Sequence, residues 1–215
     1  MEDSILNVLK IISCAAVIDL IVLSFKALGK NRSGAYMFSG MVIFFFFSSV
    51  FFGNLGIAEE WAKHLLFYTG QVFSFGFLHS MIEYYRSRHL TDEGTAPSIK
   101  PSSYGIIPVV GASSLTNFLT EQGLQHFLVL PITFLITTYI SVKKSILESQ
   151  DFRDTLDFFM AALFAFAMVH FFELAVESQK WLPSLEPFQE FIEFGWFFIG
   201  YALCGIGLAR VRNQL

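Results

Sequence analysis

Long apolar runs separated by short polar segments cover most of the chain. A helix needs about 20 mostly apolar residues to cross the hydrocarbon of a bilayer. One further run, at about 104–120, is shorter and contains Gly105, Pro108 and Gly111. That run predicts a short spanning helix, a re-entrant loop or an interfacial segment. The remaining six runs predict spanning helices, and they lie at about 5–28, 35–57, 64–86, 125–145, 155–177 and 185–208.

Basic residues predict how these helices are oriented, because Lys and Arg collect in short cytoplasmic loops. With seven spans and the N-terminus outside, the cytoplasmic loops hold eleven basic residues and the outer loops hold Lys63 and Lys180. If 104–120 does not span, seven basic residues lie on the cytoplasmic side and six on the outer side, and these counts indicate no orientation. The counts favour seven helices with a cytoplasmic C-terminus. The eleven residues are Lys26, Lys30, Arg32, Arg86, Arg88, Lys100, Lys143, Lys144, Arg153, Arg210 and Arg212.

The chain is expected to form a single transmembrane domain over residues 1–215. An offset of 120 residues aligns Trp61 with Trp181 and Phe77 with Phe197. Together with the similar loop lengths, this alignment indicates two three-helix units joined by one linker helix. Such a layout is a parallel tandem repeat. The predicted units are residues 5–88 and 124–210, and the linker helix is at about 104–120.

The composition supports the membrane assignment and excludes other classes. Hydrophobic residues make up 54% of the chain and charged residues 15%, with 27 Phe, whereas a soluble domain carries about a quarter charged residues. The net charge of −4 provides no basic field for nucleic acid. We therefore expect an all-α, multi-pass integral protein of the cell (inner or cytoplasmic) membrane. Cys14 and Cys204 lie in apolar runs and are expected to be buried free thiols.

Polar and ionisable residues inside the predicted spans fall into two groups, and an ionisable residue is costly in hydrocarbon unless it has a role. The outer group consists of Asn54, His170, Glu173, Glu190 and Glu193. His170 and Glu173 are three residues apart and share one helix face. Glu190 and Glu193 continue a carboxylate stripe that begins at Glu186, and Glu59, Glu60 and His64 lie at the same end of the predicted helices.

The inner group consists of Asp19, His79 and Glu83. Asp19 and His79 are predicted at matching depths on the first and third helices, which we expect to be neighbours. Glu83 follows His79 by one helical turn. Carboxylates and imidazoles in a membrane are typical of cation and proton pathways.

The leading hypothesis is therefore a small transporter or channel for a cation or a proton, whose pathway uses both groups. A second hypothesis is a redox or metal-binding subunit. In it, His170, Glu173, Glu190 and Glu193 bind a divalent metal, or His79 and His170 ligate a haem. Because the predicted topology places these two histidines in opposite leaflets, it weighs against a haem that they share.

A third hypothesis is a sensory or structural membrane subunit that acts with another chain. No G-x-S-x-G or H-E-x-x-H motif indicates an enzyme. The expected surroundings are the lipid bilayer. A second copy of the chain and a membrane or cytoplasmic partner subunit both remain open as binding partners.

Overall fold

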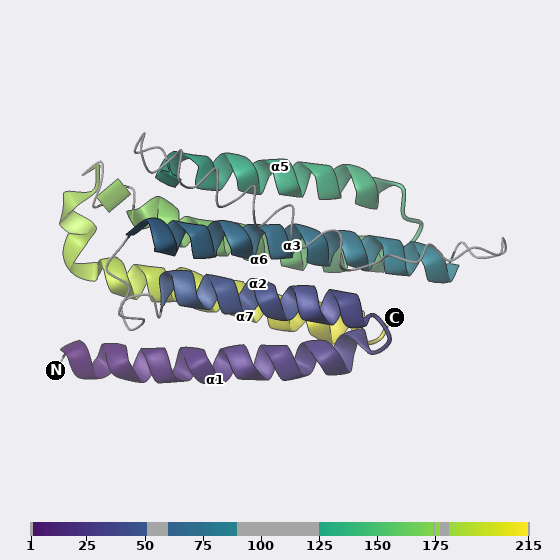
Figure 1. Cartoon of the computed structure of the whole chain (residues 1–215), viewed down its shortest axis with the longest axis horizontal. Helices are drawn as coiled ribbons and strands as arrows, with labels where there is room; N and C mark the ends of the chain where they lie inside the picture. The colour runs from purple at the N-terminus through teal and green to yellow at the C-terminus, as the bar shows by residue number, and fades with distance from the viewer. Residues whose placement is uncertain (1, 51–59, 90–124, 174, 177–180, 215) are drawn as a thin grey trace.

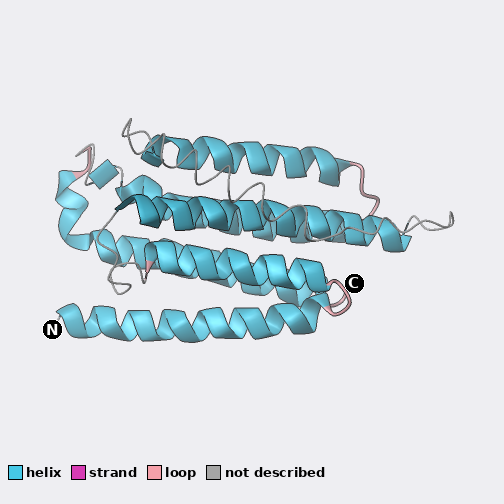
Figure 2. Cartoon of the chain, viewed as in Figure 1, coloured by secondary structure: helices cyan, strands magenta, loops and turns pink. Residues whose placement is uncertain are grey.

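The described part of the chain consists of helices joined by short loops, with no strand among the described residues (Figure 2). The structure is a computed structural model that describes residues 2–50, 60–89, 125–173, 175–176 and 181–214. Its elements are α1 (Glu2–Leu28), α2 (Arg32–Ser49), α3 (Glu60–His89), α5 (Gln125–Ser145), α6 (Gln150–Glu173), the 3₁₀ helix η3 (Pro183–Phe188) and α7 (Gln189–Val211). The predicted segment 104–120 and residues 51–57 of the second predicted helix lie outside the described residues.

Five helical segments are long and apolar enough to cross a membrane, consistent with a membrane protein. These segments are Ser4–Leu28, Ala62–His89, Leu128–Ser145, Gln150–Glu173 and Pro183–Val211. They match five of the six clear apolar runs, so the prediction of an all-helical protein with membrane-spanning helices is confirmed at that level.

The helices lie side by side along one long axis (Figure 1). α1 packs against α2 and α7, α3 packs against α2 and α5, and α6 packs against α5 and α7, which closes a ring. α6 also contacts α2 and α3 across this ring. The two chain ends lie at opposite ends of the bundle.

Helices α3 and α5 run in the same direction, although they follow one another among the described helices. Gln71 of α3 bonds to Thr133 of α5, and further along both helices Phe75 contacts Tyr139. Contacts that advance together along both helices require a parallel arrangement. The end of α3 and the start of α5 therefore lie at opposite ends of the bundle (Figure 1).

A tight turn joins α1 to α2 as an antiparallel pair. Gly29 has φ +50, a left-handed conformation that glycine adopts without steric cost. Asn31 then caps α2, because its side-chain oxygen accepts a hydrogen bond from the Gly34 N–H at 3.1 Å. The same oxygen accepts a bond from the Ser80 hydroxyl at 3.2 Å, which fixes the turn against α3.

Phenylalanine rings fill the interior where the helices meet. Phe38, Phe77 and Phe159 are buried and meet edge to face, with Phe77 4.8 Å from Phe159. Glycine allows close approach at these contacts: a Cβ added at Gly207 would lie 2.7 Å from the Phe159 ring, and one added at Gly200 would lie 2.5 Å from Phe166. The high Phe content therefore forms the core of the bundle as well as its outer surface.

Candidate functional site

A buried ion pair joins α3 to α6 at the end of the bundle where α3 begins. The carboxylate of Glu173, the last residue of α6, pairs through Oε1 with the Lys63 ammonium. Its other oxygen, Oε2, lies 3.0 Å from Nδ1 of His170. His170 is fully buried and the Glu173 side chain is 9% exposed. The carboxylate thus bonds to two basic groups, as a charge removed from water requires.

Two further α3 residues complete this site. His64 is buried, and its ring centroid lies 5.5 Å from that of His170. Phe67 meets the His170 ring edge to face at 4.1 Å. Lys63, His64 and Phe67 are one or a few residues apart, so a single stretch of α3 presents them to α6. We call Lys63, His64, His170 and Glu173 the His–Glu cluster.

The His–Glu cluster is electrically balanced when its imidazoles are neutral, because it then contains one ammonium and one carboxylate. One added proton on an imidazole gives the cluster a net positive charge. Imidazole is the side chain whose charge changes near physiological pH. The second imidazole beside His170 offers another site for that proton. The geometry therefore provides a place where imidazoles largely removed from bulk water can hold a proton.

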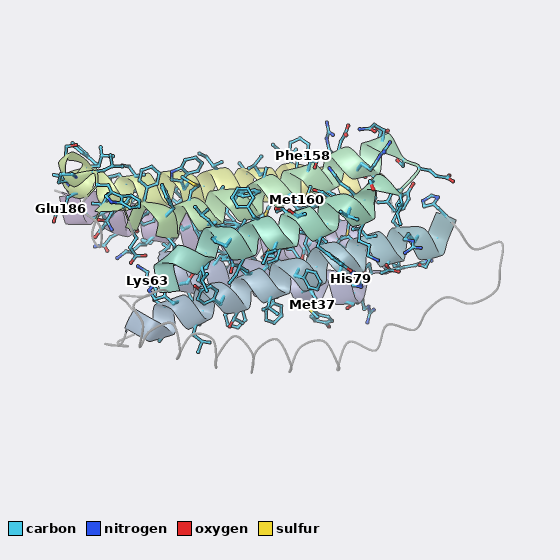
Figure 3. The ribbon with its side chains drawn as sticks, turned by 90° about the horizontal axis from the view of Figure 1, so that it is seen from above. Met37, Lys63, His79, Phe158, Met160 and Glu186 are labelled. Carbon is cyan, nitrogen blue, oxygen red and sulfur yellow. The ribbon has the colours of Figure 1, made fainter. Side chains whose placement is uncertain are left out.

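The predicted stripe of three glutamates does not continue this site. Pro183–Phe188 is a 3₁₀ helix containing Pro187, so Glu186 is not on the α-helix that carries Glu190 and Glu193. Glu186 and Glu190 are exposed, and Gln189 donates a hydrogen bond to Glu193 at 2.9 Å. Glu186 and Lys63 lie toward the same end of the bundle (Figure 3).

The prediction that His170, Glu173, Glu190 and Glu193 together bind a metal is not supported. Within the described residues, no three His, Cys, Asp or Glu side chains are grouped as metal ligands would be. The physical reason is that Lys63 and His170 already bond to the Glu173 carboxylate, while Glu190 is exposed at the first turn of α7.

The inner predicted residues are not brought together. Asp19 is exposed on α1, and α1 packs against α2 and α7 rather than lying beside α3 as expected. His79 stacks on Phe75, one turn earlier on α3, at 6.0 Å, and it lies 6.3 Å from Tyr139 of α5. Glu83 pairs with Arg86 at 3.3 Å. The three residues therefore lie in three different environments and do not form the predicted inner group.

A haem shared by His79 and His170 does not fit the bundle. His170 contacts Phe67, and His79 lies twelve residues further along α3, which is about 18 Å at 1.5 Å per residue. Figure 3 shows His79 far along α3 from Lys63. Asn54, the remaining predicted pathway residue, and Glu59 lie outside the described residues, and the side chain of Glu60 is not described.

Two members of the cluster were not predicted as site residues. Lys63 was counted only among the outer basic residues, and His64 was placed only at the same end of the helices as the outer group. The sequence does contain a signal for them. A lysine and a histidine stand side by side at the start of an apolar run, and at the end of a predicted spanning helix such a pair can meet a carboxylate at the end of a neighbouring helix.

A second polar feature is an open groove of about 680 Å³ between α5 and α6. Thr138, Ser141 and Ser145 of α5 line it, together with apolar side chains of α6. Lys144 and Asp157 form an ion pair beside it. These residues lie toward the end of the bundle opposite the His–Glu cluster.

Comparisons of the chain with known protein families, curated proteins and solved structures give no match. Any functional assignment therefore depends on the arrangement of the residues themselves.

Proposed function

We propose that this protein is a small multi-pass membrane transporter that moves protons, or a small cation in their place, through the His–Glu cluster. The observation that carries the proposal is the buried Glu173 carboxylate bonded to both Lys63 and His170. Ionisable residues inside a membrane are typical of proton relays and ion pathways. A purely structural ion pair would not need the second buried imidazole of His64 beside it.

The membrane arrangement that we propose has seven spans, with the N-terminus outside. Two observations support it. The parallel direction of α3 and α5 means that the chain between them leads from one end of the bundle to the other, as a span at about 104–120 would. In addition, ten of the twelve Lys and Arg residues of the described chain, all but Lys10 and Lys63, gather at one end. They are Lys26, Lys30, Arg32, Arg86, Arg88, Lys143, Lys144, Arg153, Arg210 and Arg212.

With the basic end in the cytoplasm, the His–Glu cluster opens toward the outer leaflet. In a repeat of three helices, a linker helix and three helices, α1 corresponds to α5 and α3 corresponds to α7. The contact of α1 with α7 is then equivalent to that of α5 with α3, which supports the proposed repeat.

The aromatic packing next to the cluster favours gated transfer over an open pore. Phe67 contacts His170, and Phe45 lies 5.0 Å from Phe67 and 4.7 Å from Phe166. These rings separate the cluster from the basic end. A proton bound at His170 would therefore continue only after the rings rearrange, as in proteins whose binding site is open to one side at a time.

Proton flux in proteoliposomes tests the proposal. Purified protein is reconstituted with a pH-sensitive dye inside the vesicles, and a potassium diffusion potential with valinomycin drives proton entry. Wild-type protein should acidify the lumen, and Glu173→Gln and His170→Asn should each slow this at least about tenfold, because each removes a group that holds the proton. Glu190→Gln is the matched control, since Glu190 is exposed, and it should retain wild-type flux.

Equal flux in wild-type, Glu173→Gln and His170→Asn vesicles would show that the cluster is not the pathway. Repeating the assay with Na⁺ or K⁺ gradients and a dye for each ion distinguishes a cation pathway from a proton pathway. Helical content measured on every variant excludes misfolding as the cause of lost flux.

A further inference from the structure

Asp19 lies on the outward face of α1, a helix that the rest of the described bundle covers sparsely. It is exposed, and no hydrogen bond or ion pair of the described chain involves it. The surrounding sequence, Ala-Val-Ile-Asp-Leu-Ile-Val, is apolar. Only 22% of the most apolar part of Ser4–Leu28 is buried within the chain.

The depth of Asp19 places it in hydrocarbon rather than at the membrane surface. It precedes Lys26, one of the basic residues gathered at one end of the bundle, by seven residues, or about 10 Å along the helix. The hydrocarbon layer is about 30 Å thick. Acidic residues at such depths almost always face a protein interior and have a partner. The described residues of this chain do not provide that interior, so a helix of another chain is the candidate partner.

The exposed face of α1 has the residue spacing of a helix-packing seam. Its residues alternate at intervals of three and four, as the a and d positions of a coiled coil do. Ala15, near the middle, is small enough to allow close approach of a second helix. Asp19 flanks the seam, next to Ile18. The seam residues, all exposed, are Val8, Ile11, Ala15, Ile18, Val22 and Phe25.

We infer that this seam docks a transmembrane helix of a different polypeptide, which places a Lys or Arg side chain against Asp19. A second copy of this chain is the poorer match. In a parallel pair of α1 helices, the position across from Asp19 is that of Cys14, five residues earlier. Lys10 is nine residues from Asp19, or about 13 Å along the helix. Neither would neutralise the carboxylate.

This inference does not depend on the proposed function. Asp19 is remote from the His–Glu cluster, so proton flux through isolated protein and docking at α1 can succeed or fail separately.

Energy transfer in phosphatidylcholine vesicles tests the docking. Full-length protein carries the donor dye, and designed transmembrane peptides carry the acceptor. The probe peptide has leucine at a and d and one lysine at the g position facing Asp19. Control peptides have leucine in place of that lysine, or carry the lysine on the opposite face. The lysine peptide should reach half-maximal transfer at about fivefold to tenfold lower density than either control.

Two variants of the protein distinguish the carboxylate from the seam. Asp19→Leu should remove the preference for the lysine peptide, and Ala15→Phe should weaken docking with the carboxylate intact, because the larger side chain prevents close approach. Glu190→Gln, at an exposed acid of α7, should behave as wild type.

Three results would overturn the inference. One is equal binding of the lysine peptide by wild-type protein and the Asp19→Leu variant. Another is equal binding of the lysine and leucine peptides by wild-type protein. The third is transfer between labelled copies of the protein that equals transfer to the lysine peptide and depends on Asp19.

Discussion

Replacement of Lys63 by methionine removes the ammonium from the His–Glu cluster while retaining a side chain of similar length. Glu173 then keeps His170, bonded at 3.0 Å, as a basic neighbour. At pH 8, with a neutral imidazole, the variant has a buried carboxylate that carries an uncompensated charge. At pH 5.5 a protonated imidazole would neutralise it. For the wild-type cluster we expect the opposite trend, because an added proton would give a neutral cluster a net positive charge.

The magnitude follows from the exposure of the three groups. Removing one partner of a buried ion pair costs about 3–5 kcal/mol. The Lys63 side chain is 18% exposed and His170 still bonds to Glu173, so a loss of about 2 kcal/mol is expected at pH 8. At pH 5.5 the imidazolium replaces the ammonium, and the difference from wild type should fall below about 1 kcal/mol. The double variant Lys63→Met/Glu173→Gln contains neither charge and should lie within about 1 kcal/mol of wild type at both pH values.

Thermal unfolding in detergent micelles, followed by circular dichroism, measures these differences as shifts in Tm relative to wild type at each pH. Lys144→Met is the matched control, because Lys144 also pairs with a carboxylate, but the partner side chain, Asp157, is 51% exposed. Its shift should be small and independent of pH. A Lys63→Met variant that loses the same stability at both pH values, or loses more at pH 5.5, would refute the reasoning.

Two predictions concern the contacts between helices. Gly200→Ala should destabilise the protein by about 1–3 kcal/mol, because the new methyl group would lie 2.5 Å from Phe166. Gly195→Ala on the same helix is the control: its methyl group has nothing within 4 Å, so Tm should be unchanged or raised. Equal shifts in Tm for the two variants would contradict the packing of α6 on α7. Gln71→Leu removes the 2.8 Å hydrogen bond to Thr133 and should cost about 1 kcal/mol, measured as a lower Tm. Gln71→Met keeps the side-chain length without the donor and should lower Tm similarly; an unchanged Tm in Gln71→Met would show that the hydrogen bond does not stabilise the contact of α3 with α5.

Much of the fold could be predicted from local sequence. The run at 125–145 corresponds to Gln125–Ser145, and the run at 5–28 corresponds to Glu2–Leu28. A run of apolar residues determines where a membrane helix lies because its backbone must satisfy its own hydrogen bonds in lipid. The main local error was at Glu186, where Pro183 and Pro187 accompany a 3₁₀ helix before α7 begins.

Contacts within the site could be predicted only between residues that are close in sequence. His170 and Glu173 share a face because they are three residues apart, and the structure brings them to 3.0 Å. The partnership of Lys63 with Glu173 joins residues 110 positions apart, and no local rule connects them. Asp19 and His79 were expected together from their depths alone, but depth does not determine which helices are neighbours.

The sequence by itself determined that this protein has helices suited to a membrane, where most of those helices lie, and that few ionisable residues fall within them. Tertiary structure decided which of those residues meet. A helix that is apolar almost all round, as α1 is, has no strongly preferred inward face. Contacts between distant segments set the neighbours and rotation of each helix. The Phe166 and Phe159 rings of α6 fit against Gly200 and Gly207 of α7, and Leu20 of α1 lies against Gly205 of α7. That packing places His170 in the interior and Asp19 on the outer surface.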